Sequence, residues 1–204
     1  MRKPKLRELR EALLALVRGP YTTKYPFEPH VPPEGFRGKP QYDVEGCIGC
    51  KACAEVCPAL AIKVADETGG AKPIRRLTVH YDKCIFCGQC ELNCTTQEGI
   101  KLTREFELAG FDRSKFREPV ELDLVICQVC GCVVGARKHL LWVARRLGPK
   151  AYANPTLIVT AEGSISLAEG ATPVKQESLS RNDMMRVVCP DCRRTIVLRE
   201  IWGE

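Results

Sequence analysis

The run Cys47-Ile48-Gly49-Cys50-Lys51-Ala52-Cys53-Ala54-Glu55-Val56-Cys57-Pro58 organises the sequence. Its cysteines have the spacing C-x2-C-x2-C-x3-C, and the same spacing returns at Cys84, Cys87, Cys90 and Cys94. Three thiolates on one tight loop can hold three irons of a cubane while the loop backbone donates N–H groups to its sulfides. Two complete runs therefore favour two iron–sulfur clusters over a zinc module or a set of disulfides.

The fourth cysteine of each run is predicted to bind the cluster of the other run, as it does in ferredoxins with two clusters. The predicted ligands of cluster 1 are then Cys47, Cys50, Cys53 and Cys94. Those of cluster 2 are Cys84, Cys87, Cys90 and Cys57. Gly49 and Gly88 stand beside ligands, where a missing side chain allows the backbone to approach closely.

Each cysteine run is flanked by short segments that suit strands. These are residues 41–45 and 61–64 around the first run, and residues 77–81 and 100–102 around the second. Residues 47–102 thus resemble bacterial-type ferredoxins with two 4Fe-4S clusters, and this resemblance implies electron transfer. One departure is Thr95, where that family usually has proline after the last cysteine.

The N-terminal segment reads as an amphipathic helix followed by an extended strap. Apolar residues recur at helical intervals, as Leu6, Leu9, Leu13, Leu16 and Val17, and arginine and lysine surround them. Such a helix suits an anionic membrane surface or a partner's groove, with an ordinary surface helix as the alternative. Gly19 and Pro20 should end it. Five prolines within residues 21–40 exclude a helix or an inner strand there.

Three short stretches ahead of the first cysteine run resemble the complex I ferredoxin-type subunit and its relatives in membrane-bound hydrogenases. They are Tyr25-Pro26, Pro32-Pro33 and Phe36-Arg37-Gly38-Lys39. Residues 106–113 resemble the segment that follows the second cluster in that family. The resemblance covers roughly residues 1–117. It implies that the helix and strap hold the subunit against its neighbours at the membrane.

Five further cysteines lie in the C-terminal third. Two C-x2-C pairs can surround a tetrahedral zinc ion at a closed structural site, and these predicted zinc ligands are Cys127, Cys130, Cys189 and Cys192. Iron in a rubredoxin-like site or a third cluster are the alternatives. Cys132 is expected to be a free thiol, although Cys132 and His139 are conceivable substitute ligands. His30 and His80 are expected to be structural or solvated.

The second pair is predicted to lie on a β-hairpin formed by residues 186–188 and 195–198, as in a zinc ribbon. Between the pairs we expect a helix over residues 136–147, then a strand from Leu157 and a loop. The predicted fold is α+β, with three parts. They are a helix and docking strap (1–40), a two-cluster ferredoxin domain (41–117) and a zinc-ribbon-like module (118–204).

The ferredoxin core combined with this tail resembles the ferredoxin-like subunit of formate hydrogenlyase. By resemblance, electrons from a formate or CO dehydrogenase or a ferredoxin-type donor would pass to NiFe hydrogenase small- and large-subunit-like partners beside membrane subunits. The alternative is the equivalent subunit of a complex I-like quinone oxidoreductase. In either complex the chain would be a non-catalytic electron carrier.

Composition and charge limit the other classes of function. The chain has 204 residues, 13 cysteines and a formal net charge of +6, and its longest apolar run, residues 12–17, is too short to span a membrane. Without a recognisable export signal, we expect a peripheral protein on the cytoplasmic side of the cell membrane. The basic excess lies in the N-terminal strap with few aromatic residues, which disfavours nucleic-acid binding. A freely diffusing ferredoxin would have no use for residues 1–40.

Overall fold

The computed structural model describes residues 5–19, 22, 24–70, 72–163 and 179–202. The chain divides into two compact units, Met1–Phe36 and Arg37–Glu204. We call them unit 1 and unit 2. Within the described residues, every helix is too short or too polar to span a lipid bilayer.

Unit 1 begins with helix α1 (Leu6–Arg18), which confirms the predicted amphipathic helix. Gly19 follows with a positive φ of 74° and ends it. None of its residues is buried, and the apolar stripe remains exposed. Residues 24–36 contain turns and extended backbone without a helix or strand, as their prolines predict.

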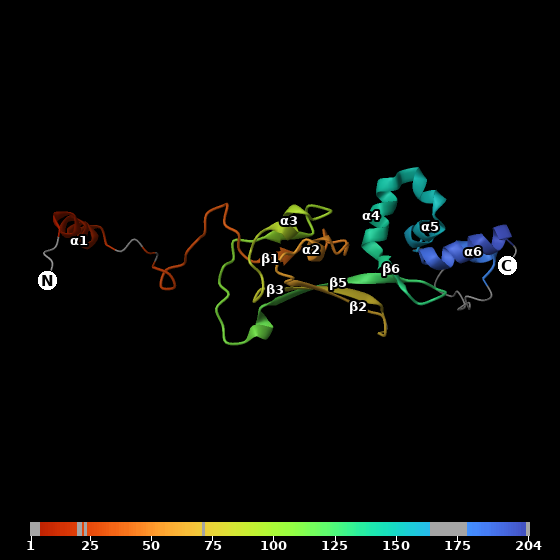
Figure 1. Cartoon of the computed structure of the whole chain (residues 1–204), viewed down its shortest axis with the longest axis horizontal. Helices are drawn as coiled ribbons and strands as arrows, with labels where there is room; N and C mark the ends of the chain where they lie inside the picture. The colour runs from red at the N-terminus through yellow and green to blue at the C-terminus, as the bar shows by residue number, and fades with distance from the viewer. Residues whose placement is uncertain (1–4, 20–21, 23, 71, 164–178, 203–204) are drawn as a thin grey trace. The chain divides into compact units, whose positions relative to one another are not determined.

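Unit 2 contains two sheets (Figure 1). Strands β1 (Pro40–Tyr42) and β4 (Ile100–Leu102) form an antiparallel pair. A second antiparallel sheet has the order β2-β3-β5-β6, with β2 at Ile62–Glu67, β3 at Ile74–His80, β5 at Arg117–Ile126 and β6 at Val133–Ala136. The four strands expected around the cysteine runs are therefore present, with small shifts at their ends.

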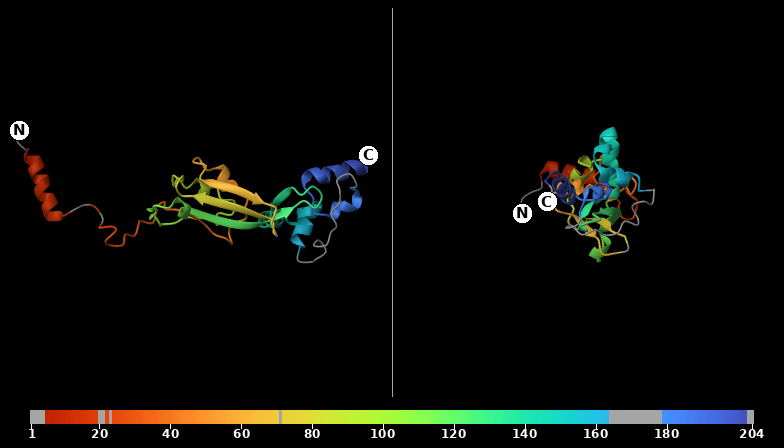
Figure 2. Two further views of the ribbon diagram at one scale, coloured as in Figure 1. Left: turned by 90° about the horizontal axis from the view of Figure 1, so that it is seen from below. Right: turned by 90° about the vertical axis from the view of Figure 1, so that its right-hand side faces the viewer.

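The buried residues of β3 and β5 alternate, as expected for strands with one face in a core. Leu77 and Val79 of β3 are at most 1% exposed, and Val120 and Leu122 of β5 are also buried. They pack with the cluster-binding part of the chain, which includes Cys47 and Cys53. Two short helices, α2 (Ala52–Glu55) and α3 (Gln89–Leu92), each lie within a cysteine run. The four-stranded sheet thus supports both cysteine runs (Figure 2).

Strand β5 continues directly into the C-terminal part of unit 2. There the expected helix is α4 (Arg137–Leu147), and α5 (Pro155–Ala161) and α6 (Pro190–Trp202) follow. The described residues also contain three short 3-10 segments, η1 (Arg113–Lys115), η2 (Gly148–Ala153) and η5 (Arg181–Met185). The division predicted at residues 117 and 118 stays a prediction, since β5 is shared by both parts.

The predicted zinc-ribbon hairpin is wrong. Residues 195–198 lie in helix α6, and residues 186–188 form no strand. Pro190 suits the first position of a helix, and Asp191 follows in the first turn, where a negative charge is favourable. Ile196, four residues after Cys192, is 1% exposed and packs with Val188. Burial of this face outweighs the strand preference of the β-branched residues.

The strand expected from Leu157 is also wrong. Residues 155–161 form α5, because the Asn154 side chain accepts a hydrogen bond from the Thr156 N–H at 3.1 Å and Pro155 takes the first helical position. The loop expected after it lies largely in residues 164–178, outside the described residues.

Candidate metal centres

The first candidate site is a cavity between β1, α2 and β4. Its lining includes the apolar side chains of Ile48, Leu77 and Ile100 and the phenol of Tyr42. The cysteines that line it are Cys47, Cys50, Cys53 and Cys94. Three come from the first run and one from the second, which is the set predicted for cluster 1.

The second candidate site is a cavity beside α3, lined mainly by apolar residues that include Val79, Ile62 and Leu102. Its cysteines are Cys57, Cys84, Cys87 and Cys90. Again one cysteine crosses over from the other run. Each cavity therefore offers four thiols in apolar surroundings, a donor set that suits a 4Fe-4S cluster.

The cysteine loops make their turns through left-handed backbone. Gly49 and Lys51 have φ of 71° and 69° in the first loop, and Phe86 and Gly88 have φ of 53° and 78° at the corresponding places of the second. At Gly49 a Cβ atom would lie 3.0 Å from both Ala136 and Leu122. The first loop is therefore packed so closely against β5 and β6 that a side chain would displace it, as the sequence predicts for this glycine.

Burial raises the pKa of four of the eight cavity thiols. It raises the pKa of Cys47 and Cys84, and it raises that of Cys53 to about 11 and that of Cys90 to about 12. These thiols are therefore protonated near neutral pH when no metal is bound. Since thiolates are the ligands, loading the cavities with iron must release protons.

A buried arginine of the sheet is hydrogen-bonded to the backbone of the first cysteine loop. Arg75 of β3, 5% exposed, donates from Nη1 to the Gly49 carbonyl oxygen at 2.8 Å. Its Nε and Nη2 atoms bind the two carboxylate oxygens of Asp66 on the neighbouring strand, at 2.7 and 2.8 Å. These hydrogen bonds hold the pKa of Asp66 below its usual range. This pair was not predicted from the sequence. The visible signal was an arginine on the same face of the strand as the apolar residues Leu77 and Val79.

We expect Asp66→Asn to destabilise unit 2 by about 3 kcal/mol, because it leaves the buried Arg75 charge without its counter-ion. The measurement is the denaturant midpoint at which the metal-loaded chain loses its visible absorbance. The matched control is Glu67→Gln on the same strand, which breaks an exposed ion pair with Arg76 and should cost less than about 1 kcal/mol. Equal losses in the two variants would contradict the role of Arg75.

The Arg75–Asp66 pair makes the stability of unit 2 depend on pH. The folded pKa of Asp66 lies below its unfolded value of about 3.9. Its contribution to stability is therefore complete above that unfolded value and is lost as the pH falls through the lower folded pKa.

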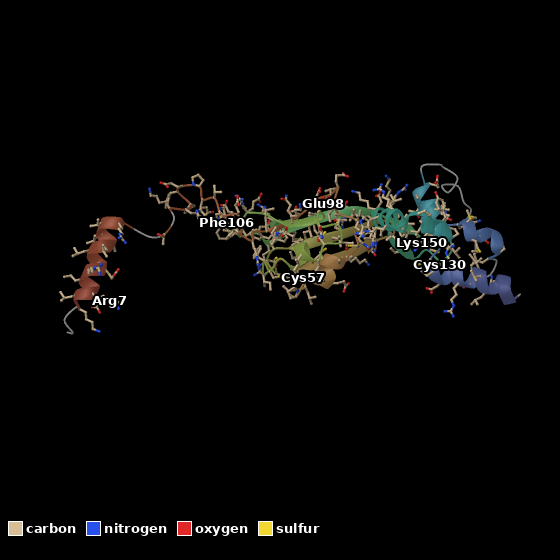
Figure 3. The ribbon with its side chains drawn as sticks, turned by 90° about the horizontal axis from the view of Figure 1, so that it is seen from above. Arg7, Cys57, Glu98, Phe106, Cys130 and Lys150 are labelled. Atoms are coloured by element: carbon tan, nitrogen blue, oxygen red, sulfur yellow. The ribbon has the colours of Figure 1, made fainter. Side chains whose placement is uncertain are left out.

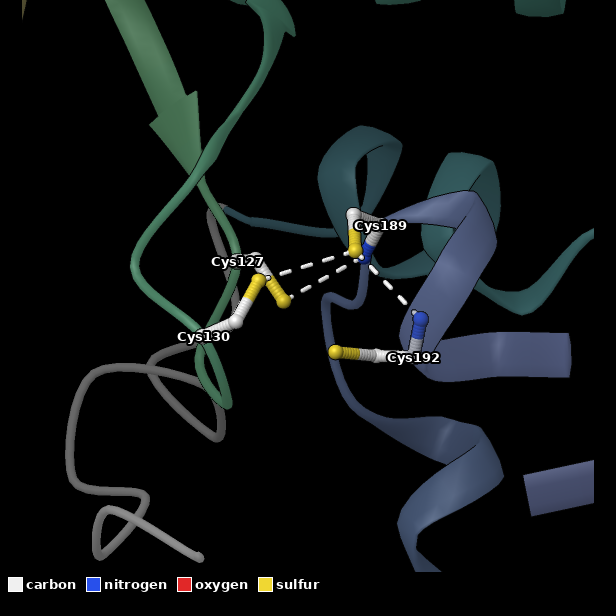
Figure 4. A group of neighbouring side chains, drawn as sticks. All are labelled: Cys127, Cys130, Cys189 and Cys192. Atoms are coloured by element: carbon white, nitrogen blue, oxygen red, sulfur yellow. Dashed lines mark hydrogen bonds between the residues drawn. The ribbon is translucent and has the colours of Figure 1, made fainter. Parts of the chain in front are cut away.

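The third candidate site is a cluster of four cysteines, which we call the tetrad (Figure 4). One sulfur from each of Cys127, Cys130, Cys189 and Cys192 lies within 4.8 Å of the other three. The first two cysteines follow β5, and the last two stand before and within the first turn of α6. Figure 3 labels Cys130 of the tetrad and Cys57 of the second cavity, which lie in separate parts of unit 2.

Backbone hydrogen bonds preorganise the tetrad. The Cys189 N–H donates to Cys127 Sγ at 3.3 Å, and the Cys192 N–H donates to Cys189 Sγ at 3.4 Å. Although burial alone would raise it, N–H groups of Cys130 and Cys189 lower the pKa of Cys127 to about 6. At Cys127 the thiolate is thus favoured before any metal arrives. The two loops that carry the tetrad also bind each other, since the Gln128 N–H donates to the Val187 carbonyl at 2.9 Å.

The substitute ligands considered from the sequence lie outside the tetrad. Cys132 is exposed, and contact with the Cys130 thiol raises its pKa to about 12. The His139 ring on α4 is 6.4 Å from the ring of Trp142 and is not among the grouped ligands. All four tetrad sulfurs come from the C-x2-C pairs that the spacing selected.

Comparison with known proteins adds relatives of two kinds. Residues 46–97 match the 4Fe-4S dicluster domain family. NAD(P)H-quinone oxidoreductase subunit I of Gloeobacter violaceus is 35% identical over 100 residues, which cover 47% of this chain and 47% of that protein. NADH-quinone oxidoreductase subunit I 2 of Geobacter metallireducens is 32% identical over 119 residues, 55% of this chain and 90% of that protein.

Formate hydrogenlyase subunit 6 of Escherichia coli is 38% identical over 122 residues, 60% of this chain and 66% of that protein. The chain thus spans about half of the Gloeobacter protein and about two thirds of the Escherichia protein. Among solved structures, a chain of the membrane-bound sulfane sulfur reductase, an archaeal respiratory membrane complex, has a TM-score of 0.40 at 28% identity, covering 57% of this chain and 61% of that one.

Proposed function

We propose that this chain, which belongs to the NADH-quinone oxidoreductase subunit I family, passes electrons through two 4Fe-4S clusters to the NiFe hydrogenase module of a membrane-bound complex. It is an electron-transfer iron–sulfur subunit. The observation that carries the proposal is the pair of cavities, each lined by four cysteines. When bound, each cluster accepts and releases one electron at a time.

The chain's own residues hold and insulate the two clusters. Cys47, Cys50, Cys53 and Cys94 would hold the first, and Cys84, Cys87, Cys90 and Cys57 the second. Apolar side chains such as Leu77 and Val79 exclude water from the cavities, and the crossing of Cys57 and Cys94 ties the two sites into one body. In this scheme the subunit carries electrons and breaks no bond in an organic molecule.

The electron acceptor can be a hydrogenase module or a quinone site. We propose the hydrogenase because formate hydrogenlyase subunit 6 matches a longer stretch of this chain, at a higher identity, than either quinone oxidoreductase subunit described above. A formate or CO dehydrogenase or a ferredoxin-type protein would supply the electrons.

The test is to isolate the tagged full chain from its native cells in mild detergent and identify its partners by mass spectrometry. NiFe small- and large-subunit-like proteins are expected. Recovery of flavin and quinone-site subunits in their place would establish the complex I-like alternative.

We propose that the tetrad binds one Zn²⁺ ion. At a Zn–S distance of about 2.3 Å, tetrahedral geometry separates the sulfurs by about 3.8 Å. The Cys130 and Cys189 sulfurs are 3.7 Å apart, which suits one ion better than the wider spread that a third cluster demands. Four thiolates leave no open coordination position, so the ion would have a structural role.

We propose that unit 1 attaches the subunit to an anionic membrane on the cytoplasmic side. In α1, Leu6, Leu16 and Val17 are at least 81% exposed, and Leu9 and Leu13 are more than half exposed. Arg7, Arg10 and Arg18 of the same helix supply positive charge, and Arg7 is labelled in Figure 3. Such a helix lies in the membrane interface with its apolar face buried.

We expect Leu13→Glu in the full chain to reduce binding to vesicles of anionic lipid by about tenfold, because burying one leucine contributes about 1.5 to 3 kcal/mol. The measurement is co-sedimentation with the vesicles. Ala15→Glu is the matched control, since it adds the same charge on the opposite face of α1 and should have a much smaller effect. Equal losses in both variants would show that charge alone drives binding and that the apolar stripe has another role.

A further inference from the structure

The two cluster cavities differ in the hydrogen-bond donors that face their cysteine sulfurs. In the first cavity, the Thr95 hydroxyl oxygen lies 3.1 Å from Cys50 Sγ. The Tyr42 hydroxyl oxygen lies 3.7 Å from Cys53 Sγ. A cysteine bound to iron has lost its proton, so in a loaded site each hydroxyl must donate to the sulfur. We call Tyr42 and Thr95 the hydroxyl pair.

A third hydroxyl nearby is already committed. Thr96 Oγ1 lies 3.5 Å from Cys94 Sγ, but it donates its single proton to the Gly46 carbonyl oxygen at 2.9 Å. It also accepts a hydrogen bond from the Gly99 N–H at 3.1 Å. By contrast, the side-chain hydroxyls of Tyr42 and Thr95 make no other hydrogen bond among the described residues.

The internal duplication of the sequence shows what the second cavity has at the same places. Tyr42 stands five residues before Cys47, and Val79 stands five residues before Cys84. Thr95 follows the last cysteine of its run, and Pro58 follows the last cysteine of the other. Valine and proline carry no hydroxyl. Among the described residues, the sulfurs of the second cavity receive backbone donors, such as the Phe86 N–H on Cys84 at 3.4 Å and the Ala61 N–H on Cys57 at 3.3 Å.

Two ligands of the first cavity are more deeply buried than any ligand of the second. Cys47 and Cys53 are 7% and 8% exposed, whereas Cys50, Cys94 and all four cysteines of the second cavity are partly exposed. An added electron makes a cluster and its thiolates more negative, and burial disfavours that charge. Donors to the sulfurs favour it and raise the reduction potential.

We propose that the hydroxyl pair raises the reduction potential of the cluster in the first cavity and offsets the deeper burial of its ligands. This inference rests on the proposed function, because it assumes that both cavities hold clusters. Tyr42 and Thr95 are positioning residues, since they act through Cys53 and Cys50. Their hydrogen bonds counteract the effect of burial, so that an added electron is not much less stable on this cluster than on the other.

The test is a redox titration of the full chain, followed by EPR, in the wild type and in Thr95→Val and Tyr42→Phe. Each variant should lower the reduced-to-oxidised ratio of one cluster about tenfold at a fixed potential, which is about 59 mV for one electron. The midpoint of the other cluster should not move. Thr95→Ser, which keeps the hydroxyl, should behave as the wild type. Pro58→Thr introduces a hydroxyl at the corresponding place of the second cavity. It should raise the midpoint of the cluster that the other variants leave unchanged.

Iron and sulfide analysis of the same samples separates two kinds of failure. Fewer than two clusters in the wild-type chain would overturn the proposed function. Two clusters whose midpoints stay unchanged in Thr95→Val and Tyr42→Phe would overturn the role of the hydroxyl pair. Equal shifts of both midpoints would also overturn it, because the pair contacts ligands of one cavity only.

Discussion

Replacing Cys94 by alanine should remove the cluster of the first cavity, although Cys94 belongs to the second cysteine run. Iron should fall from about eight to about four atoms per chain, since each cluster holds four. The physical reason is the crossing of the fourth ligands. Cys94 lines the cavity of Cys47, Cys50 and Cys53, and the thiols of its own run line the other cavity.

Double variants tell which cluster has been lost. If Cys94 and Cys50 hold the same cluster, Cys50→Ala combined with Cys94→Ala should still leave about four irons. Cys87→Ala combined with Cys94→Ala should leave almost none. The opposite outcome, about four irons in the second double variant and none in the first, would show that each run binds its own cluster. Cys132→Ala, which changes an exposed cysteine outside both cavities, should keep the full iron content.

The ferredoxin part was predictable because metal ligation leaves a rigid spacing in the sequence. The spacing identified the eight cysteines that line the two cavities, and the apolar segments around them became β1 to β4. Strand β5 was not predicted, because strands were expected only in the segments beside the cysteine runs. Its alternating apolar and polar residues, 117–126, lie beyond the second run. The Arg75–Asp66 pair and the hydroxyl pair depend on contacts between strands and loops, which no single segment displays.

The C-terminal part shows where local preference fails. The sequence Thr195-Ile196-Val197-Leu198 has strong strand preference, yet it lies in α6. Pro190 allows a helix to begin, and Cys192 and Ile196, one helical turn apart, are both 1% exposed. Tertiary burial of that face therefore decides the element. The predicted ligand set does not depend on the hairpin, because C-x2-C pairs also form at the end of a strand and at the start of a helix.

The tetrad leads to the second large expected effect. Cys189→Ser combined with Cys192→Ser should remove one metal ion per chain and lower the thermal unfolding midpoint of the C-terminal part. Structural zinc contributes on the order of 10 kcal/mol to the folding of small domains. Among the described residues, the core around the tetrad includes Leu179, Val188 and Ile196, packed with three of the cysteines. Without the ion, we expect the apolar contacts of this core to be too weak to offset the entropy cost of ordering the segment.

The ferredoxin part of the same double variant should keep its two clusters. Both cavities are lined by residues within 40–102, and none of the tetrad cysteines is among them. The measurements are zinc and iron analysis together with amide hydrogen exchange, which should increase in α5 and α6 but not in β2 and β3. Cys132→Ser is the matched control, because it changes a neighbouring exposed cysteine and should keep the zinc. A wild-type chain with about twelve irons and no zinc would instead make the tetrad a third cluster site, and the electron path would then extend to the C-terminal part.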